Sequence, residues 1–568
     1  MTDVTKLVHA HPELAIFVAI VLGFLLGRIH IKGIGLGTVV GTLIAGLALG
    51  ILFTPEIPDL LKWAFFDLFL FAIGYATGPQ FFAGLKKEAL PQIGLALVVS
   101  ISGLVTALAV AWFFKFDPGT AAGVASGGLT QSAALGTALA TIAELPVDDA
   151  TKALWSSHVP LADAVTYVFG DIGVILFVVA AAPLLLRVKV RDAAIALEDE
   201  LAGDGRGPDA KLAYQRFVYR ALRLDKPEFD GLTVHEFESD FADARLYVER
   251  IRRDGVVIDD LTQSTRLHVG DVLAVGARRT AMVGADTRIG PEVDDDALLS
   301  FPLKEAQVVV TRRNIAGRKI SDIAIEYGRG VFLTRITRGQ LDLPVSPGTV
   351  PHRGDVLHVV GSPLNIERVA HHAGFIDADP DRFALPFLAA GLSVGILFGL
   401  VSYRFGTVPL GLGTSCAILL TGLLTGWARS RYPLFGGIPD SATRILQDVG
   451  LTVFIAIVGL TAGPHAVAVL HERGVSFFLT VFAAGAIVTI VPQLLGFFVG
   501  AKILKMSLPI LLGGLAGAQT ATPGLNALKE AGGNNVFVLG FTVPYAINNV
   551  LLTLWGTVIV TVVYSWGR

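Results

Sequence analysis

Two polar stretches decide the fold class of this chain: Ser126-Gly127-Gly128-Leu129-Thr130-Gln131-Ser132 in its first half and Ala518-Gln519-Thr520-Ala521-Thr522-Pro523-Gly524 in its second. Each interrupts an apolar segment rich in Gly, Ala, Ser and Thr, at residues 120–142 and 508–528. Irregular backbone at membrane depth is tolerated only where it is buried in protein or lines a cavity. We therefore expect an α-helical, polytopic membrane protein with two broken helices.

The composition also indicates a membrane protein. Of the 568 residues, 53% are hydrophobic and 16% are charged, whereas soluble domains carry about 25% charged residues. Charge gathers between residues 187 and 382, which hold 28 of the 45 Lys and Arg and 32 of the 48 Asp and Glu. This distribution predicts two membrane regions, at 1–187 and 381–568, that flank one water-soluble insert.

The composition excludes several function classes. A net charge of −3 argues against a nucleic-acid partner, because such proteins carry a basic face. Cys416 is the single cysteine and lies in an apolar run, so neither disulfides nor zinc organise the fold. The sequence contains no catalytic triad, Walker loop or metal-ligand cluster. We expect a protein that is not an enzyme and has no cofactor or metal.

Ten segments are long and apolar enough to be spans, which need about 20 mostly apolar residues. They cover residues 14–28, 34–53, 60–77, 93–114 and 160–186, and then 383–401, 408–427, 445–462, 476–499 and 536–563. The two broken segments are expected to be re-entrant, entering the membrane and returning to the same side.

The distribution of charge supports this count, because cytoplasmic loops are rich in Lys and Arg. With re-entrant segments and an outside N-terminus, the inner loops hold Arg28, Lys32, Lys86, Lys87, Arg187, Lys189, Arg191, Arg429, Arg431, Lys502 and Lys505. The outer loops then hold Glu56, Asp59, Glu144, Asp148 and Asp149. We expect both termini outside and the insert in the cytoplasm.

The two membrane regions share motifs in the same order. Residues 35–38 recur at 411–414, 73–79 at 458–464, and 165–167 at 543–545. Gln131-Ser132-Ala133 recurs as Gln519-Thr520-Ala521. Since each region has five true spans, the second enters the membrane from the opposite side. Inverted repeats with broken helices are typical of secondary transporters; the alternative is an old duplication without a transport role.

The predicted fold class is therefore two inverted repeats of five spans plus one re-entrant segment each, with a cytoplasmic α+β insert. The tips of the broken helices supply hydroxyls, amides and peptide groups, and half-helix N-termini favour a carboxylate. The candidate substrate-binding residues are Gly127, Gly128, Thr130, Gln131, Ser132, Gln519, Thr520, Thr522, Pro523, Gly524, Asn548 and Asn549. The alternatives are a small-residue packing face for the glycines and structural hydrogen bonds for the asparagine pair.

Other polar positions are less decisive. Asp67, Asp163, Asp171, Asp448 and His465 are ionisable groups in or near the membrane, where either a function or solvation at the interface explains them. The motifs at 74–79 and 459–464, each with two glycines and a proline, are expected to break helices at their ends. Neither tip, nor residues 73–80, contains Lys or Arg. A dicarboxylate, a monocarboxylate and a neutral amino acid therefore all remain possible substrates.

The insert is itself duplicated. The motifs at 231–234, 250–253 and 270–273 recur at 317–320, 335–338 and 354–357, and short alternating runs predict strands. We expect one domain at 188–290 and a second at 291–380, with the acidic stretch 292–296 as the linker between them.

Each insert unit resembles the C-terminal regulatory domain of potassium-uptake and channel-gating proteins, the TrkA-C or RCK-C type. The whole chain resembles the aspartate:alanine exchanger family, best in residues 72–82 and 165–170. The resemblance implies a secondary transporter that exchanges small carboxylates or amino acids, such as aspartate for alanine or a dicarboxylate such as succinate, across the bacterial inner membrane. It also implies an elevator-type movement, a homodimer, and a small regulatory ligand on the insert.

Three alternatives stay open. The first is a carboxylate symporter coupled to Na⁺ or H⁺, since coupling depends on coordination geometry that the sequence does not show. The second is a cation channel or transporter gated by the RCK-C-like domains, although no repeated selectivity-filter sequence is present. The third is a membrane sensor whose insert signals to a partner, which leaves the polar tips unexplained.

Overall fold

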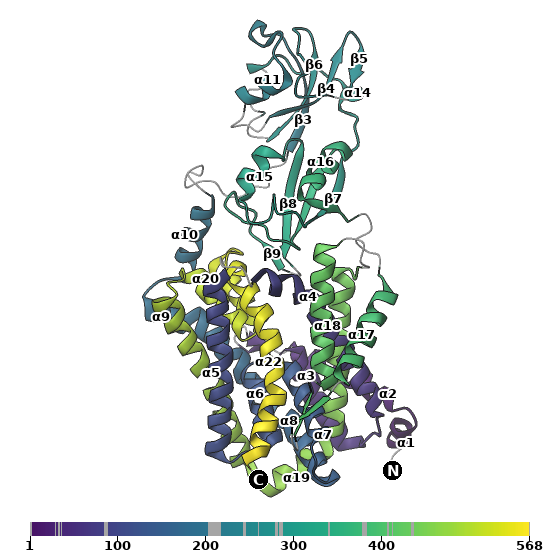
Figure 1. The fold of residues 1–568 in the computed structure, drawn as a ribbon, viewed down its shortest axis with the longest axis vertical. Helices are drawn as coiled ribbons and strands as arrows, with labels where there is room; N and C mark the ends of the chain where they lie inside the picture. Colours follow the sequence, from purple (N-terminus) through teal and green to yellow (C-terminus); the bar gives the residue numbers. More distant parts are fainter. Residues whose placement is uncertain are drawn as a thin grey trace.

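The computed structural model describes residues 3–28, 30–31, 34–35, 37–84, 89–202, 217–241, 246–259, 261–278, 282, 288–338, 341–377, 383–400, 402–405, 408–411, 413–432 and 437–566. Helices form a long body, an α+β insert projects from one end of it, and both termini lie at the opposite end (Figure 1). The predicted loop residues Lys32, Lys86 and Lys87 lie outside the described residues.

The described residues of the first half of the body form helices and one short pair of strands. Its elements are α1 (Asp3–Ala10), α2 (Pro12–Gly27), β1 (His30–Ile31), β2 (Ile34–Gly35), α3 (Thr38–Phe53), α4 (Asp59–Gly84), α5 (Leu90–Phe114), α6 (Pro118–Gly128), α7 (Ser132–Glu144), α8 (Asp149–Leu176), the π-helical turn η2 (Phe177–Ala181), α9 (Ala182–Leu186) and α10 (Val190–Ala202).

The second half has a similar order of elements. They are α17 (Leu385–Gly399), β12 (Ser402–Phe405), β13 (Val408–Gly411), α18 (Gly413–Arg431), α19 (Asp440–Phe498), η5 (Val499–Ile503), α20 (Leu508–Ala518), α21 (Thr522–Gly532) and α22 (Val538–Trp566). α19 contains two predicted spans, which meet at a kink where Gly474 adopts a φ of 67°.

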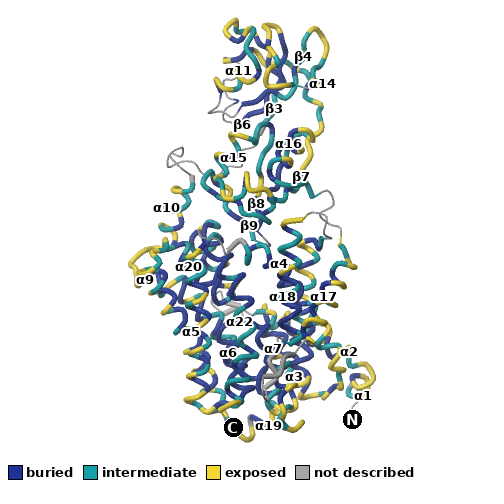
Figure 2. Tube along the Cα trace, viewed as in Figure 1, coloured by how far each residue is buried: buried dark blue, intermediate teal, exposed yellow. Residues whose placement is uncertain are grey.

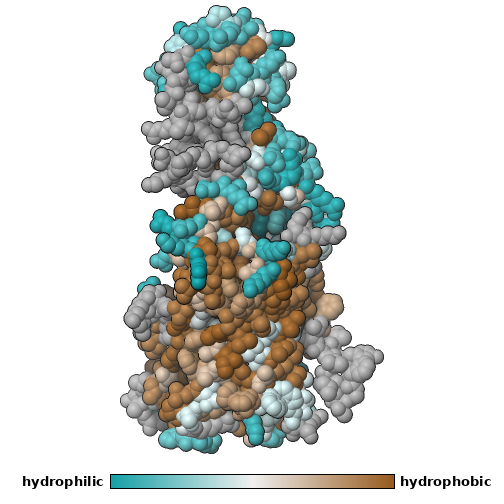
Figure 3. All heavy atoms as spheres, turned by 90° about the vertical axis from the view of Figure 1, so that its left-hand side faces the viewer, coloured by the Kyte–Doolittle hydropathy of each residue, from teal (hydrophilic) through white to brown (hydrophobic). Residues whose placement is uncertain are grey.

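The chain is a polytopic membrane protein. Among the described residues, six segments are long and apolar enough to cross a membrane: 59–82, 90–114, 149–186, 440–469, 474–503 and 538–566. Figure 3 shows that the body presents a mainly hydrophobic face whereas the insert is hydrophilic. Four other predicted spans fall on α2, α3, α17 and α18, which are not among the six. Two of these were predicted to begin too early, because residues 34–35 and 408–411 form antiparallel strand pairs with β1 and β12.

The glycine and proline motifs do not end helices, contrary to expectation. Residues 74–79 lie inside α4, and residues 459–464 lie inside α19. The structural reason is close packing between the two halves of the chain. Gly74 and Gly78 lie against backbone carbonyl groups of α18, and Gly459 and Gly463 against those of α3. Small residues at every fourth position let helix backbones approach closely, so these glycines join helices rather than interrupt them.

The described residues of the insert form two sheets whose strand orders correspond, except that the second sheet has one extra edge strand, β11. The first sheet runs β3-β6-β4-β5 and the second β11-β7-β10-β8-β9, all antiparallel. The first unit comprises β3 (Phe217–Arg223), η3 (Pro227–Phe229), α11 (Val234–Asp240), β4 (Tyr247–Arg253), β5 (Val256–Ile258) and β6 (Val272–Arg278). The second comprises β7 (Lys304–Val310), α15 (Ile320–Glu326), β8 (Val331–Arg338), β9 (Leu341–Leu343), β10 (Val356–Gly361), α16 (Pro363–Ala373) and β11 (Gly374–Ile376).

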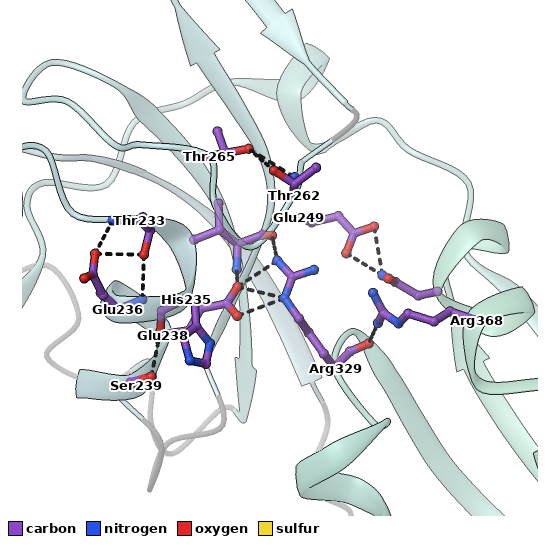
Figure 4. Close-up of polar contacts among 12 residues, drawn as sticks. Thr233, His235, Glu236, Glu238, Ser239, Glu249, Thr262, Thr265, Arg329 and Arg368 are labelled. Carbon is purple, nitrogen blue, oxygen red and sulfur yellow. Dashed lines mark hydrogen bonds and ion pairs between the residues drawn. The ribbon is translucent and has the colours of Figure 1, made fainter. Parts of the chain in front are cut away.

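The repeated insert motifs occupy equivalent places in the two units. Arg253 donates to both carboxylate oxygens of Asp271 at 2.8 and 2.7 Å, and Arg338 donates to those of Asp355 at 2.9 and 2.8 Å. Figure 4 shows how the units meet: the Arg329 side chain donates to the Glu238 carboxylate and to the Val248 carbonyl oxygen. The two units therefore have the same Arg–Asp ion pair at equivalent positions, and charge-assisted hydrogen bonds hold the units together.

The acidic stretch 292–296, predicted to link the two insert units, lies between β6 and β7 and packs against the first sheet. Glu292 pairs with Arg220 at 2.6 Å, and Asp295 pairs with Arg252 at 2.7 Å. The short helix α14 (Asp296–Leu299) follows, and its Leu298 is fully buried beside residues of β3 and β6. Ion pairs and apolar burial thus attach this stretch to the first sheet.

The second insert unit contacts the body directly. The Gly348 N–H donates to the Leu201 carbonyl oxygen of α10 at 2.5 Å, and Gly354 lies against Pro79 of α4 and Ser430 of α18. Inside the body, the buried residues form two large apolar clusters: one includes α6 and α7, and the other includes α20 and α21 together with the second insert sheet (Figure 2). The insert therefore meets helices from both membrane regions.

Candidate substrate site

The tips of the two interrupted helix pairs meet inside the body. α6 ends at Gly128 and α7 begins at Ser132, while α20 ends at Ala518 and α21 begins at Thr522. The Thr130 hydroxyl donates to the Gln519 carbonyl oxygen, and the Thr520 hydroxyl donates to the Thr130 carbonyl oxygen at 3.2 Å. This reciprocal pair of hydrogen bonds joins residues that are 390 positions apart in the chain.

The two tips have the same backbone conformation. Thr130 and Thr520 both adopt a φ of 53°, which is unusual for a β-branched residue. Each of these threonines donates its N–H to a glycine carbonyl three residues earlier, at 3.1 Å in the first tip and 2.9 Å in the second. Each next residue closes a wider turn: Gln131 N–H donates to the Ser126 carbonyl at 2.8 Å, and Ala521 N–H to the Ala516 carbonyl at 2.9 Å.

This geometry corrects the register of the predicted repeat. The sequence comparison placed Gln131 opposite Gln519, whereas the structure places Thr130 opposite Thr520 and therefore Gln131 opposite Ala521. Ser132 and Thr522, the first residues of α7 and α21, become the matched hydroxyl pair. The register is set by the left-handed threonine and by the hydrogen bonds that close each turn. The identity of two glutamines in the sequence gives no information about either feature.

Each interrupted pair begins and ends at the same end of the body. Along α6, Gly119, Gly123 and Gly127 contact the Trp155, Val159 and Asp163 carbonyl groups of α8 in that order, so α6 and α8 run in the same direction. Since α8 begins only four residues after α7 ends, α7 returns to the end where α6 started. Along α20, Gly513 and Gly517 contact the carbonyl groups of Phe537, just before α22, and of Phe541 within α22 in the same order.

The N-termini of α7 and α21 point into the contact between the tips. Their N-cap residues are Gln131 and Ala521, and neither helix has a side-chain cap. A helix N-terminus carries unpaired N–H groups and a partial positive charge, which favours an anionic group. The segments α6, α7 and α20 contain no Lys or Arg, so these two N-termini are the positive features at the tips.

Two tyrosines at matched positions complete the polar shell. Tyr167 of α8 lies beside the Ser132 side chain, and Tyr545 of α22 lies beside the Thr522 and Asn549 side chains. Both tyrosines lie in the repeated triplets 165–167 and 543–545 but are not among the predicted site residues. The distance along the chain between each tyrosine and its tip gave no sign that Tyr167 lies beside Ser132 and Tyr545 beside Thr522.

The predicted site residues separate into two groups. Thr522 and Pro523 are exposed and Thr520 is half-buried, while Thr130, Gln131 and Ser132 are 4–5% exposed at the tips. Gln131 Nε2 lies 3.4 Å from both Asn549 oxygens, and Asn548 Nδ2 donates to the Ala96 and Ala518 carbonyl oxygens at 3.1 and 2.5 Å. The asparagine pair therefore braces both tips against α5 and α22.

The other predicted residues hold helices together. Gly127 packs against α8, Gly128 against the second half of α19, and Gly524 against Val174. Gln519 is fully buried: its Nε2 donates to the Thr489 carbonyl oxygen at 3.0 Å, and its Oε1 accepts from Gln493 Nε2 at 2.9 Å. Both ends of this amide are engaged by α19, so Gln519 supports the tip rather than facing it.

The ionisable residues are also separated by the fold. Asp163 and Asp171 lie on α8, where Asp163 is buried against α6 and Asp171 is half-buried one turn beyond Tyr167. Asp67 is half-buried on α4, whereas Asp448 and His465 are exposed on α19. A cavity of about 550 Å³ lies elsewhere, between residues 54–58 and residues 460–464 of α19.

Together these features define a multi-pass membrane protein in which two helix pairs, each broken at a polar tip, meet in the interior. A family model described as the predicted permease membrane region of the Asp-Al_Ex family matches residues 15–183 and 387–561. The chain belongs to this family. The resemblance to aspartate:alanine exchangers is thereby confirmed at the level of the family, while the insert lies outside the matched residues.

Similar proteins from several bacteria are named as transporters. An uncharacterized transporter of Bordetella parapertussis is 52% identical over all of this chain and 99% of its own length. Others from Bradyrhizobium diazoefficiens and Shewanella oneidensis are 39% and 35% identical over 99% and 97% of this chain and 99% and 98% of their own lengths. No solved structure matches the chain. The family and these names identify a membrane transporter.

Proposed function

We propose that the protein is a secondary transporter that exchanges small carboxylates or amino acids, with the contact between the two tips as its substrate site. The observation that carries this proposal is the pair of hydrogen bonds between the tips, from the Thr130 hydroxyl to the Gln519 carbonyl and from the Thr520 hydroxyl to the Thr130 carbonyl, beside two uncapped helix N-termini. Preformed peptide N–H groups and hydroxyls there offer a carboxylate the partners that it loses on leaving water. Aspartate, alanine and a dicarboxylate such as succinate are the substrates to test first.

The proposed architecture is a pair of inverted repeats, each with five spans and one re-entrant segment. Contacts between the halves support it: Gly74 and Gly78 of α4 pack on α18, while Gly459 and Gly463 of α19 pack on α3. The parallel course of α6 with α8, and of α20 with α22, supports re-entrant segments that enter from opposite ends. Inverted repeats that meet at broken helices serve alternating access in secondary transporters.

We further propose an elevator-type movement of the tips and their supporting helices against a scaffold of α2, α3, α4, α17 and α18 that forms a homodimer. The protein would lie in the inner membrane, with both termini outside and the insert in the cytoplasm. Both termini lie at the end of the body away from the insert, in agreement with this topology (Figure 1). The two insert units are proposed to be TrkA-C-like domains that bind a small regulatory ligand.

The test is uptake of labelled aspartate, alanine and succinate into proteoliposomes that contain the full-length protein, with and without the same compounds preloaded. Uptake that requires an internal substrate supports exchange and identifies the substrate class. Uptake into empty vesicles, driven only by a sodium or proton gradient, would show a symporter instead.

Matched variants test the assignment of the site. Ser132→Ala and Thr522→Val remove the hydroxyls at the starts of α7 and α21, and we expect each to raise KM at least tenfold. Thr561→Val is the control, because the Thr561 hydroxyl donates only within α22, to the Thr557 carbonyl oxygen at 2.9 Å. Unchanged kinetics in both site variants would show that the substrate binds elsewhere.

A further inference from the structure

Asp163 is a buried carboxyl group that the proposed substrate site does not use. Its side chain is 1% exposed and lies on the face of α8 that contacts α6. Asp163 Oδ1 is 2.6 Å from Ser126 Oγ. Ionised carboxylates in a membrane interior are costly unless a cation or several hydrogen bonds compensate their charge, so the surroundings of this group decide its protonation state.

The helices around Asp163 bring no cation to it. α3, α6, α7, the second half of α19 and α21 pack against α8. The sequences of α3, α6, residues 132–143 of α7 and residues 474–498 of α19 contain no Asp, Glu, Lys, Arg or His. In α21 the charged residues are Lys529 and Glu530, in the last turn away from the tip.

The nearest ionisable groups on α8 do not neutralise Asp163 either. Tyr167 and Asp171 follow within two or three turns, and neither carries positive charge. His158 precedes Asp163 and is paired with Asp117, the N-cap of α6, with Nδ1 2.9 Å from Oδ2. Within the described part of the chain, an ionised Asp163 would therefore face hydrogen-bonding groups but no free cation.

The hydrogen bonds of Ser126 fit a protonated carboxyl. Ser126 Oγ lies within hydrogen-bonding distance of two oxygens, Asp163 Oδ1 at 2.6 Å and the Gly123 carbonyl oxygen at 3.1 Å. A hydroxyl has one proton to donate. If that proton goes to the carbonyl oxygen, which is always an acceptor, the short contact to Asp163 requires a proton on the carboxyl. A separation of 2.6 Å is in the range of O–H···O bonds.

We propose that Asp163 is a proton-binding site that is occupied while the tips are in contact and is emptied when they separate. Ser126 supplies the link, because its side chain bonds Asp163 and its carbonyl oxygen accepts the Gln131 N–H that closes the first tip. Proton binding converts the carboxylate to a neutral acid that donates to Ser126 and stabilises the closed turn. Only the coupling of this proton to transport rests on the proposed function.

Infrared spectroscopy of the purified full-length protein at neutral pH tests the proton itself. We expect a protonated carboxyl C=O band that shifts in D₂O, is lost in Asp163→Asn and is moved in frequency in Ser126→Ala. Asp448→Asn is the matched control, since Asp448 is exposed on α19, and it leaves the band unchanged. If the band is unaffected in both Asp163→Asn and Ser126→Ala, the proposal is wrong, whatever the transport assays show.

Proteoliposomes with an internal pH dye test the coupling. We expect labelled aspartate, alanine or succinate uptake to move protons in the wild-type protein, and a pH gradient to change its rate at least threefold. Asp163→Asn loses both responses, whereas Ser157→Ala keeps them, because the buried Ser157 hydroxyl donates only along α8. Transport without proton movement, or coupled to sodium alone, would refute the coupling. No transport of any of the three compounds would overturn the proposed substrates and leave the infrared result standing.

Discussion

Replacing Thr130 by valine and by glycine separates two opposing contributions of this residue to folding stability. These are the hydrogen bond of its hydroxyl, which stabilises the fold, and the strain of its left-handed backbone, which destabilises it. Valine has the same shape but removes the hydroxyl that donates to the fully buried Gln519 carbonyl. A buried polar group that loses its partner costs about 1–3 kcal/mol. The valine variant keeps the left-handed backbone at a φ of 53°, so we expect it to show the whole of that loss.

Glycine removes the same hydroxyl but relieves the backbone. A left-handed conformation costs a non-glycine residue roughly 1–2 kcal/mol, so glycine gains that amount of stability here. Glycine's greater freedom in the unfolded chain lowers the gain by about 0.5–1 kcal/mol. We therefore expect Thr130→Gly to be more stable than Thr130→Val by about 0.5–1 kcal/mol and less stable than the wild type.

Thermal unfolding of the purified protein in detergent, with the three proteins compared side by side, measures this order. Thr520→Val in the same assay removes the second hydrogen bond between the tips, from the Thr520 hydroxyl to the Thr130 carbonyl oxygen. The tip contact would be refuted if neither valine substitution lowered the unfolding temperature. A glycine variant less stable than the valine variant would refute the strain.

Three further predictions concern the scaffold and the insert. Gly426→Val should destabilise the protein by about 3 kcal/mol through overpacking, because a Cβ at this position would overlap a backbone carbonyl of α4. Gly94→Ala is the control in the same thermal assay. It should be tolerated, because the new Cβ meets only side-chain atoms at 3.5 Å. Arg338→Ala leaves the buried Asp355 carboxylate unpaired, which should cost the insert about 3–5 kcal/mol and appear as early proteolysis of residues 300–376. Burial and a neighbouring arginine lower the pKa of His358 below 6.5 in the folded protein. Below pH 6.5 the unfolded chain therefore binds a proton at this histidine more readily than the folded chain does. The contribution of His358 to folding stability is thus full above pH 6.5 and falls as the pH drops below it. Unfolding of wild type and His358→Gln at pH 5 and pH 8 measures this, and an equal loss in both proteins would show that another group titrates.

Much of the candidate site follows from local properties of the chain. The polar tips were recognisable because Gly, Ser, Thr and Gln interrupt apolar runs, and this signal needs no knowledge of neighbours. The role of Gln519 was not recognisable in this way. Its amide bonds to Thr489 and Gln493, and a glutamine that braces a helix has the same sequence signature as one that faces a substrate.

Hydropathy and backbone propensity are properties of short segments, so the order of residues was enough to predict the membrane character of the chain, the position of the charged insert, its internal duplication and the two helix breaks. Only the tertiary structure decided that Thr130 pairs with Thr520, that the glycines of α4 and α19 join helices, and that Tyr167 and Tyr545 reach the starts of α7 and α21. These facts depend on contacts between residues hundreds of positions apart. Their register is fixed by backbone hydrogen bonds and close helix packing, which residue identity alone does not specify.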